Sequence, residues 1–316
     1  MAAHHLICDG WTLRLLLDEL GRQYAATTAV LPAPALPAPA PPAPALPAPA
    51  GGTPYPQCLL ERDRAWHERP EVFAYWRSVL NECEAPRVTV PPAARGTVPG
   101  AGGGTAVEAA IPADRSRLIR GLARRHRVTP FLVFATVYAA TIARFSGVSV
   151  VPVASSFHGR PAPALKRVAG LFATMLVLRA DLTGDPPFAE FLARMRQSYR
   201  DCLANQNATL EELALERPLA RAPFFRHVIS YHPASFAVAD FGGMPADLRL
   251  VSGKPAPNEL EFHVRELADS FALQLRFDPA ALDSAAAQGF LDAFGELLNS
   301  VTADPRRSVT AVSVTR

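Results

Sequence analysis

The sequence predicts an α/β (α+β) sandwich, in which helices pack over a mixed sheet. Three observations lead to this class. Stretches with apolar residues at helical spacing alternate along the chain with short runs rich in β-branched residues. Each kind of element has one apolar face, and layering helices over a sheet buries both. Finally, 316 residues with 49% hydrophobic content can form a sizeable core, as one large domain or two smaller lobes.

The N-terminal part of the chain is predicted to hold helices around a proline-rich insertion. Residues 11–24 carry leucines and a tyrosine three or four positions apart, which predicts an amphipathic helix, and Asp9 stands where its N-cap would stand. Residues 31–50 consist of Pro and Ala with three leucines. Because proline lacks an amide donor and fixes φ, we expect an exposed insertion, 31–52, without helix or strand. The other elements expected here are helices at 57–66 and 71–82, broken at Pro70, and a short strand at 88–92.

The rest of the chain is predicted to alternate between helices and strands. Thr129 would cap a helix that begins at Pro130, since proline favours the first helical position. This helix is apolar nearly all round, so we expect it to be buried. Asp283 would open the last long helix. Helices are expected at 114–125, 130–145, 187–206, 210–215 and 283–301. Strands are expected at 105–111, 148–154, 170–179 (after a turn), 227–232, 246–251, 260–264 and 271–277.

Composition argues against several classes of function. The net charge is +3, with 32 basic residues scattered among 29 acidic ones, and no nucleic-acid-binding stripe stands out. Arg120, Arg124 and Arg125 on one helix are better explained as a solvated face than as a carrier-protein patch. The four cysteines form no CxxC pair, which makes a metal site or a disulfide framework improbable. Neither a signal peptide nor a membrane span is predicted, so a cytoplasmic protein is the default expectation.

The most specific motif is HHxxxDG, formed by His4, His5, Asp9 and Gly10. It places two histidines, an acid and a glycine within seven residues, where an extended segment runs into a helix. Because side chains alternate along a strand, only one histidine can face a given cleft. Gly10 permits a backbone geometry closed to other residues. A lone pair of histidines would indicate a tag-like tail, but the full motif before a leucine-rich helix is much more specific.

This stretch resembles the core motif of nonribosomal peptide synthetase condensation domains, which share a superfamily with chloramphenicol acetyltransferase. Later segments resemble the same family in the right order. They are Thr129-Pro130-Phe131, the run GLFATMLVLR at 170–179, APFF at 222–225, Asn258-Glu259-Leu260 and Ala303-Asp304-Pro305. The chain departs from the family at Thr174, where asparagine is usual, and at Asn205 and Asn207, which replace the outer residues of an HQD motif. These changes set it apart from the common peptide-forming members.

The resemblance implies two chloramphenicol-acetyltransferase-like lobes, the first truncated and the second complete. Residues 1–91 would be the C-terminal remnant of the N-lobe, with the HHxxxDG motif and the insertion, and residues 92–316 would form the C-lobe. We favour a fragment of a longer gene product over a partner chain that supplies the rest of the first lobe.

The resemblance further implies acyl transfer: formation of an amide (peptide) bond between carrier-protein-tethered thioester substrates in nonribosomal peptide, or antibiotic, biosynthesis. The implied catalytic set is His5, Asp9 and Gly10. His5 would act as general base or position the amine. Asp9 would be structural and paired to an arginine, and the Gly10 amide could approach the oxyanion. No cofactor would bind directly, because the substrates are attached to the phosphopantetheine of peptidyl or aminoacyl carrier proteins. These carriers and adjacent synthetase domains are the implied partners, with no nucleic acid, metal or membrane.

Four residues are the expected substrate-binding set: His4, His158, Arg160 and Thr174. His158 precedes Gly159-Arg160 in a loop that lines the tunnel in the family. Two alternatives stay open. One is a non-catalytic interaction domain that recruits partners, which the changes at Thr174, Asn205 and Asn207 would favour. The other is an epimerisation-type relative with the same motif. The intact His5 and Asp9 favour the enzyme.

Overall fold

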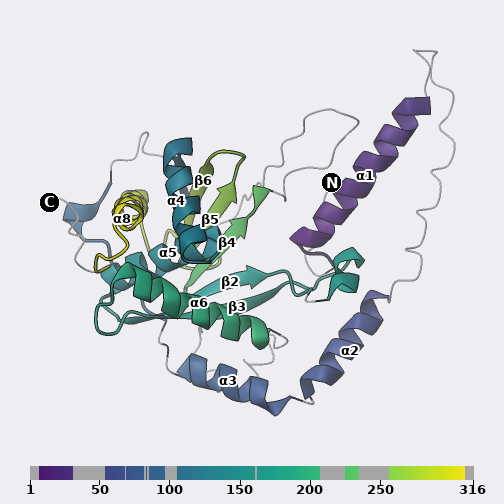
Figure 1. Ribbon diagram of the computed structural model, residues 1–316, viewed down its shortest axis with the longest axis horizontal. Coiled ribbons are helices and arrows are strands. Elements are labelled where there is room, and N and C mark those ends of the chain that lie inside the picture. Colours follow the sequence, from purple (N-terminus) through teal and green to yellow (C-terminus); the bar gives the residue numbers. More distant parts are fainter. Residues whose placement is uncertain are drawn as a thin grey trace. The chain divides into compact units, whose positions relative to one another are not determined.

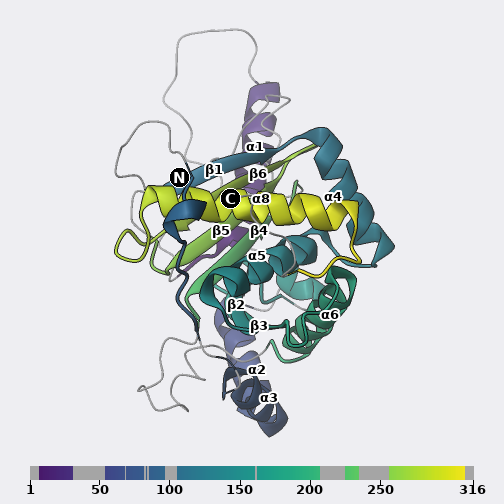
Figure 2. The same cartoon turned by 90° about the vertical axis from the view of Figure 1, so that its left-hand side faces the viewer.

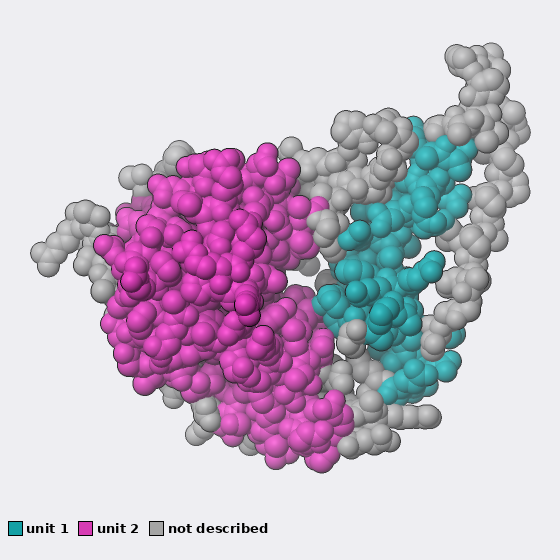
Figure 3. All heavy atoms as spheres, in the orientation of Figure 1, with its two compact units in different colours: residues 1–68, 158–173, 235–250 teal, residues 69–157, 174–234, 251–316 magenta. Residues whose placement is uncertain are grey.

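The computed structural model describes residues 7–30, 54–67, 69–81, 83, 85–96, 105–160, 162–206, 225–234 and 256–309. The Pro/Ala insertion, the helix expected at 210–215 and the strand expected at 246–251 lie outside these residues. The chain forms two compact units, coloured separately in Figure 3. The first comprises Met1–Glu68, His158–Ala173 and Ser235–Leu250, and the second comprises Arg69–Phe157, Thr174–Ala234 and Val251–Arg316.

Among the described residues, the first unit contains two long helices and one short one. Helix α1 spans Gly10–Val30, α2 spans Tyr55–His67, and the 3₁₀ helix η2 spans Pro163–Arg167 (Figure 1). The first helix is therefore confirmed and runs about two turns beyond the expected end. Leu16, Leu20 and Tyr24, each four residues apart, are 37%, 50% and 42% exposed, so they form an apolar stripe along α1.

The second unit is built on a six-stranded mixed sheet in the order β1-β6-β5-β4-β2-β3. Its strands are β1 (Ala106–Ile111), β2 (Val150–Phe157), β3 (Thr174–Asp181), β4 (His227–His232), β5 (Leu260–Glu266) and β6 (Phe271–Phe277). The pairs β2–β4 and β4–β5 are parallel, and the other three are antiparallel. The strands expected at 105–111, 227–232, 260–264 and 271–277 are confirmed to within two residues at each end.

The described residues of the second unit also form the helices α3 (Pro70–Asn81), α4 (Ala113–Arg125), α5 (Pro130–Ser146), α6 (Phe188–Ala204) and α8 (Ser284–Ala303). Helices α5, α6 and α8 pack against strands of the sheet. Figure 2 shows α5 and α8 crossing the same face of the sheet. On that face the ring of Phe134 contacts Phe271 and Phe294, and Phe262 contacts Tyr138 and Phe294. Aromatic side chains from two helices and two strands thus form the core.

The predicted helix caps are confirmed. Thr129 Oγ1 accepts a hydrogen bond from Leu132 N at 3.4 Å, and Pro130 occupies the first turn of α5. Asp283 Oδ1 accepts from Ala286 N at 2.8 Å at the start of α8. Helix α5 is buried without interruption from Phe131 to Ala143, as its all-round apolar sequence predicts.

The strand predicted at 88–92 is wrong. Within 85–96 the structure has no strand and only a 3₁₀ turn, Pro92–Ala94. Val88 N donates instead to the Glu259 carboxylate at 2.8 Å, and Thr89 N donates to Phe145 O at 3.1 Å. Prolines at 86, 91 and 92 remove the amide donors that a strand ladder needs, so the segment is held by single bonds.

The compact units divide the chain at Glu68, whereas the sequence places the lobe boundary at residue 91. The difference arises because α3 packs with the second unit. Trp76 is fully buried and its Nε1 donates to Asn205 O at 2.9 Å, at the end of α6. Burial of such a large aromatic side chain stabilises the attachment strongly.

Three features are absent from the described residues. None of their helices alone has the length and apolar composition of a membrane span, and α4 and α5 meet these criteria only as a pair bent by 100°. No group of three or more His, Cys, Asp or Glu side chains among them is placed to hold a metal ion. All four cysteines are buried and none forms a disulfide.

Candidate active site

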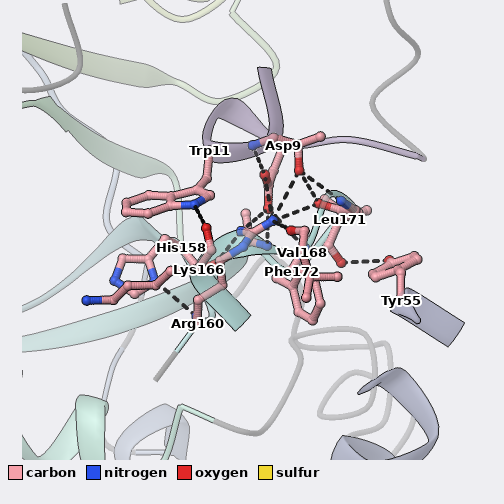
Figure 4. Close-up of polar contacts among 12 residues, drawn as sticks. Asp9, Trp11, Tyr55, His158, Arg160, Lys166, Val168, Leu171 and Phe172 are labelled. Atoms are coloured by element: carbon pink, nitrogen blue, oxygen red, sulfur yellow. Dashed lines mark hydrogen bonds and ion pairs between the residues drawn. The ribbon is translucent and has the colours of Figure 1, made fainter. Parts of the chain in front are cut away.

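The HHxxxDG motif enters α1 through an N-cap made by Asp9. Asp9 Oδ1 accepts a hydrogen bond from Thr12 N at 2.8 Å, and Asp9 O accepts from Leu13 N at 3.0 Å (Figure 4). A short acidic side chain satisfies an amide that has no partner within the helix, and it suits the positive end of the helix dipole. The predicted capping role of Asp9 is confirmed.

Asp9 also forms a buried ion pair with Arg160. Arg160 Nη1 lies 2.6 Å from Asp9 Oδ2, and Nη2 lies 3.2 Å from Asp9 Oδ1, in the two-pronged geometry typical of an arginine and a carboxylate. The Arg160 and Asp9 side chains are 0% and 2% exposed. The arginine partner expected for Asp9 therefore exists, and it comes from a loop 151 residues away.

Two further amides complete the shell of the carboxylate. Phe172 N and Ala173 N each donate to Asp9 Oδ2 at 3.0 Å. Burial alone would raise the pKa of the Asp9 carboxyl. The hydrogen bond from Arg160 and those from Thr12 and Phe172 outweigh burial and hold the pKa below its usual value. Asp9 is thus ionised at neutral pH, and its lone pairs are occupied, so it cannot serve as a proton acceptor in a reaction.

The two terminal nitrogens of Arg160 also bind main-chain carbonyls of the loop His158–Ala173 and the hydroxyl of Thr12. Nη1 donates to His158 O at 3.0 Å, and Nη2 donates to Gly170 O at 3.0 Å and to Thr12 Oγ1 at 3.1 Å. The guanidinium also lies over the ring of Phe172, 4.5 Å from its centre. Arg160 therefore has a structural role. The expectation that it binds substrate is corrected, because its side chain is fully buried among groups of the chain itself.

Thr12 is the main residue that the sequence did not single out. Its hydroxyl donates to Gly170 O at 2.7 Å and accepts from Gly170 N at 2.9 Å, and it is 3% exposed. It thus pairs with both main-chain groups of one loop residue, as a strand neighbour would. In the sequence, a polar residue on the inner side of an apolar helix could have indicated this role.

Two glycines allow the loop to approach so closely. Gly159 has φ +61°, and a Cβ there would overlap the Phe172 carbonyl oxygen. A Cβ on Gly170 would overlap the ring of Tyr55, whose hydroxyl donates to Leu171 O at 2.8 Å. Both positions therefore require glycine.

His158 lies at the exposed rim of this cluster, against Trp11. Its ring centre is 5.5 Å from that of Trp11, whose Nε1 donates to Lys166 O at 2.9 Å. His158 Nδ1 accepts from Arg160 N at 2.9 Å, so the neutral ring carries its proton on Nε2. Partial burial, and then the positive charges of Arg160 and Lys166, lower the pKa of His158. The ring is therefore neutral at pH 7 and offers one N–H donor at the surface.

The structure brings together only part of the predicted site. Asp9, Gly10, His158 and Arg160 belong to the first unit. Thr174 is the first residue of β3 in the second unit, where it pairs with Phe157. His4 and His5 lie outside the described residues. Gly10 is the first residue of α1, and the described glycines with positive φ are others, so the special geometry expected at Gly10 is corrected to a helical one.

The described arrangement can do one chemical task well: it holds a fixed, ionised carboxylate and a helix N-terminus at the end of the histidine motif. A rigid frame of this kind keeps a neighbouring reactive side chain in a narrow range of positions, which is the basis of catalysis by orientation.

Comparison with known proteins agrees with this frame. A family model described as condensation domain matches residues 62–316. The dimodular nonribosomal peptide synthase of Bacillus subtilis is 27% identical over 322 residues, which cover 98% of this chain and 13% of that protein. The chain is thus a small part of the length of such relatives.

Two solved structures share the fold. The first condensation domain of the calcium-dependent antibiotic synthetase, in complex with a substrate analogue, matches with a TM-score of 0.77 at 19% identity, over 99% of this chain and 66% of that one. The X-domain from teicoplanin biosynthesis, in complex with OxyB, matches with a TM-score of 0.74 at 17% identity, over 99% of this chain and 69% of that one. Because the family model covers well over half of the residues, the protein belongs to the condensation domain family.

Proposed function

We propose that this chain carries out condensation-type acyl transfer in nonribosomal peptide biosynthesis. An acceptor amine attacks the carbonyl carbon of a donor thioester, a C–N bond forms, and the C–S bond breaks. The proton that the amine loses passes through a base to the departing thiolate, so the products are an amide and a free thiol. The reaction therefore requires one group of the protein that accepts or orients this proton.

We assign that group to His5. An unperturbed imidazole has a pKa of about 6.5 and can accept a proton near neutral pH. Such a group contributes roughly 10²- to 10⁴-fold to the rate. The observation that carries the proposal is the buried Asp9–Arg160 pair, because it fixes the chain four residues after His5 in a member of the condensation family. A motif without a reactive histidine would not need so rigid an anchor.

Other residues have supporting roles in this proposal. Gly10 opens α1, and the first amides of a helix lack partners within it, which supports a role for its N–H toward the oxyanion. His158 Nε2–H would donate to a substrate carbonyl. Thr174 and His4 would complete the substrate-binding set.

The proposed partners are the peptidyl and aminoacyl carrier proteins, whose phosphopantetheine arms deliver both substrates, together with adjacent synthetase domains. The chain itself would bind no cofactor. The proposed layout places the N-lobe remnant at 1–91 and the C-lobe at 92–316.

The test is product formation from two loaded carriers. The chain is assayed alone and with a complete first lobe supplied, with an acyl donor on one carrier and an aminoacyl acceptor on the other. We expect an amide of the combined mass, detected by mass spectrometry, that requires both loaded carriers. Release of the free acid alone, or no product with the complete lobe, would contradict acyl transfer to an amine.

A non-catalytic recruiting domain is the second candidate function. The observation in its favour is the match to the X-domain, which was solved in complex with OxyB. The same assay separates the two candidates, since a recruiting domain would form no amide.

A further inference from the structure

The two outer strands of the described sheet differ in how their free edges are protected. At the β3 edge, α6 satisfies main-chain groups with side chains: Cys202 Sγ donates to Val177 O at 3.2 Å, and Ser198 Oγ accepts from Arg179 N at 3.0 Å. The β1 edge is different. Among the described residues, the bond that reaches its main chain from outside the sheet is that of Ser116 Oγ to Ile111 O, at 3.2 Å.

A cavity of about 270 Å³ lies beside this edge. Ala109, Ala110 and Ile111 all line it, although successive side chains of a strand point to opposite faces. Leu273 of the neighbouring strand β6 and residues of α8 line it as well, so the cavity lies between the helices and the sheet at its β1 border. Figure 2 shows β1 at the border of the sheet, with α8 and α4 nearby.

The cavity has free space on the side of α8 because this helix carries a glycine there. Gly295 lines the cavity, and a Cβ added to it would meet no atom within 4 Å. Leu291 and Leu298, one turn before and after, make the wall apolar. Arg115, in the first turns of α4, is exposed and places a positive charge at the rim.

We propose that the edge of β1 and this cavity bind an extended peptide segment of a partner protein. Its backbone would pair with β1, an apolar side chain would enter the cavity, and a carboxylate would meet Arg115. Strand addition of this kind derives affinity from main-chain bonds and specificity from pockets for alternate side chains. The volume favours one side chain over a whole small molecule, because ligand pockets usually measure about 300–1,000 Å³.

The occupant is an extended strand because of the donors and acceptors that the edge presents. Alternate residues of an edge strand direct N–H and C=O groups outward, and only another extended backbone satisfies them in series. Glu108, whose carboxylate accepts from Gln274 Nε2 at 2.7 Å, is held toward the neighbouring strand and away from the edge.

The test uses a fluorescent, alternating Thr/Val heptapeptide with a central leucine and a neighbouring glutamate. The matched control is the same peptide N-methylated at alternate residues, which cannot complete the strand ladder. We expect the first to bind the full chain with a Kd below about 1 mM by fluorescence anisotropy, and the second to bind at least about tenfold more weakly.

Two protein variants locate the site. Gly295→Leu fills the cavity and should abolish peptide binding while raising Tm, because glycine is a poor helix former. Gly121→Leu is the control: its side chain also meets nothing within 4 Å and lies on α4 away from the cavity lining, so Tm should rise and binding should persist. Equal binding of both peptides, binding unaffected by Gly295→Leu, or no binding at about 1 mM would overturn the proposal.

Discussion

Replacing Asp9 by asparagine should release the loop His158–Ala173 from the start of α1. The change keeps the shape of the side chain and removes its charge, so Arg160 is left buried without a counter-ion. Loss of one partner of a buried pair costs about 3–5 kcal/mol. The upper part of this range fits here, because the two side chains are 0% and 2% exposed and water cannot replace the lost charge.

Hydrogen exchange of the Phe172 and Ala173 amides measures this release directly, since both donate to Asp9 Oδ2. A loss of about 4–5 kcal/mol corresponds to exchange roughly 10³- to 10⁴-fold faster. Asp18→Asn on the same helix is the control: its pair with Arg14 is 3.5 Å long and more than one-third exposed, and such surface pairs contribute about 0–1 kcal/mol.

The double variant Asp9→Asn/Arg160→Met should recover part of the loss, because no buried charge is left unpaired. If Asp9→Asn exchanges no faster than Asp18→Asn, the ion pair does not hold the loop, and the anchoring role given to the motif aspartate is refuted.

Three further results are expected. The free energy of unfolding should fall as the pH drops from about 6.5 to 4. Burial, and then His263 and Arg265, lower the pKa of His232 to about 4, so in this range the unfolded state alone binds the proton. Up to about 3 kcal/mol of this fall should vanish in His232→Gln, as followed by urea titration. Gly159→Ala should lower Tm more than Gly184→Ala, since both glycines have positive φ but only a Cβ at Gly159 would clash with Phe172. An equal fall in Tm would mean that backbone strain alone, and not the clash, destabilises both variants. Deleting residues 31–50 should leave Tm nearly unchanged in a thermal melt, and a large drop would show that this segment packs against the fold.

The sequence predicted best what is decided locally. Asp9, Thr129 and Asp283 each cap the helix that follows, as their short polar side chains predict. The strands from β4 to β6 followed from β-branched and aromatic content. The strand prediction at 88–92 was wrong because it rested on the β-branched Val88 and Val90, whereas the surrounding prolines lack the amide donors of a strand ladder.

The site was predictable only in part because its contacts join distant residues. Asp9 indicated an arginine partner, but its own surroundings could not name Arg160, 151 residues further on. Arg160 resembled a substrate ligand, since burial is invisible in a sequence. Thr12 and the close approach at Gly170 depend on how the loop crosses α1, which no local pattern encodes.

The single-turnover rate of amide formation by His5→Ala shows whether the motif histidine takes part in the reaction. With both carriers loaded, the first lobe complete, and the Tm matching that of the unaltered chain, the rate should fall by roughly 10²- to 10⁴-fold. A rate equal to that of the unaltered chain would contradict the account, because the anchored motif would then hold a histidine that the reaction does not use.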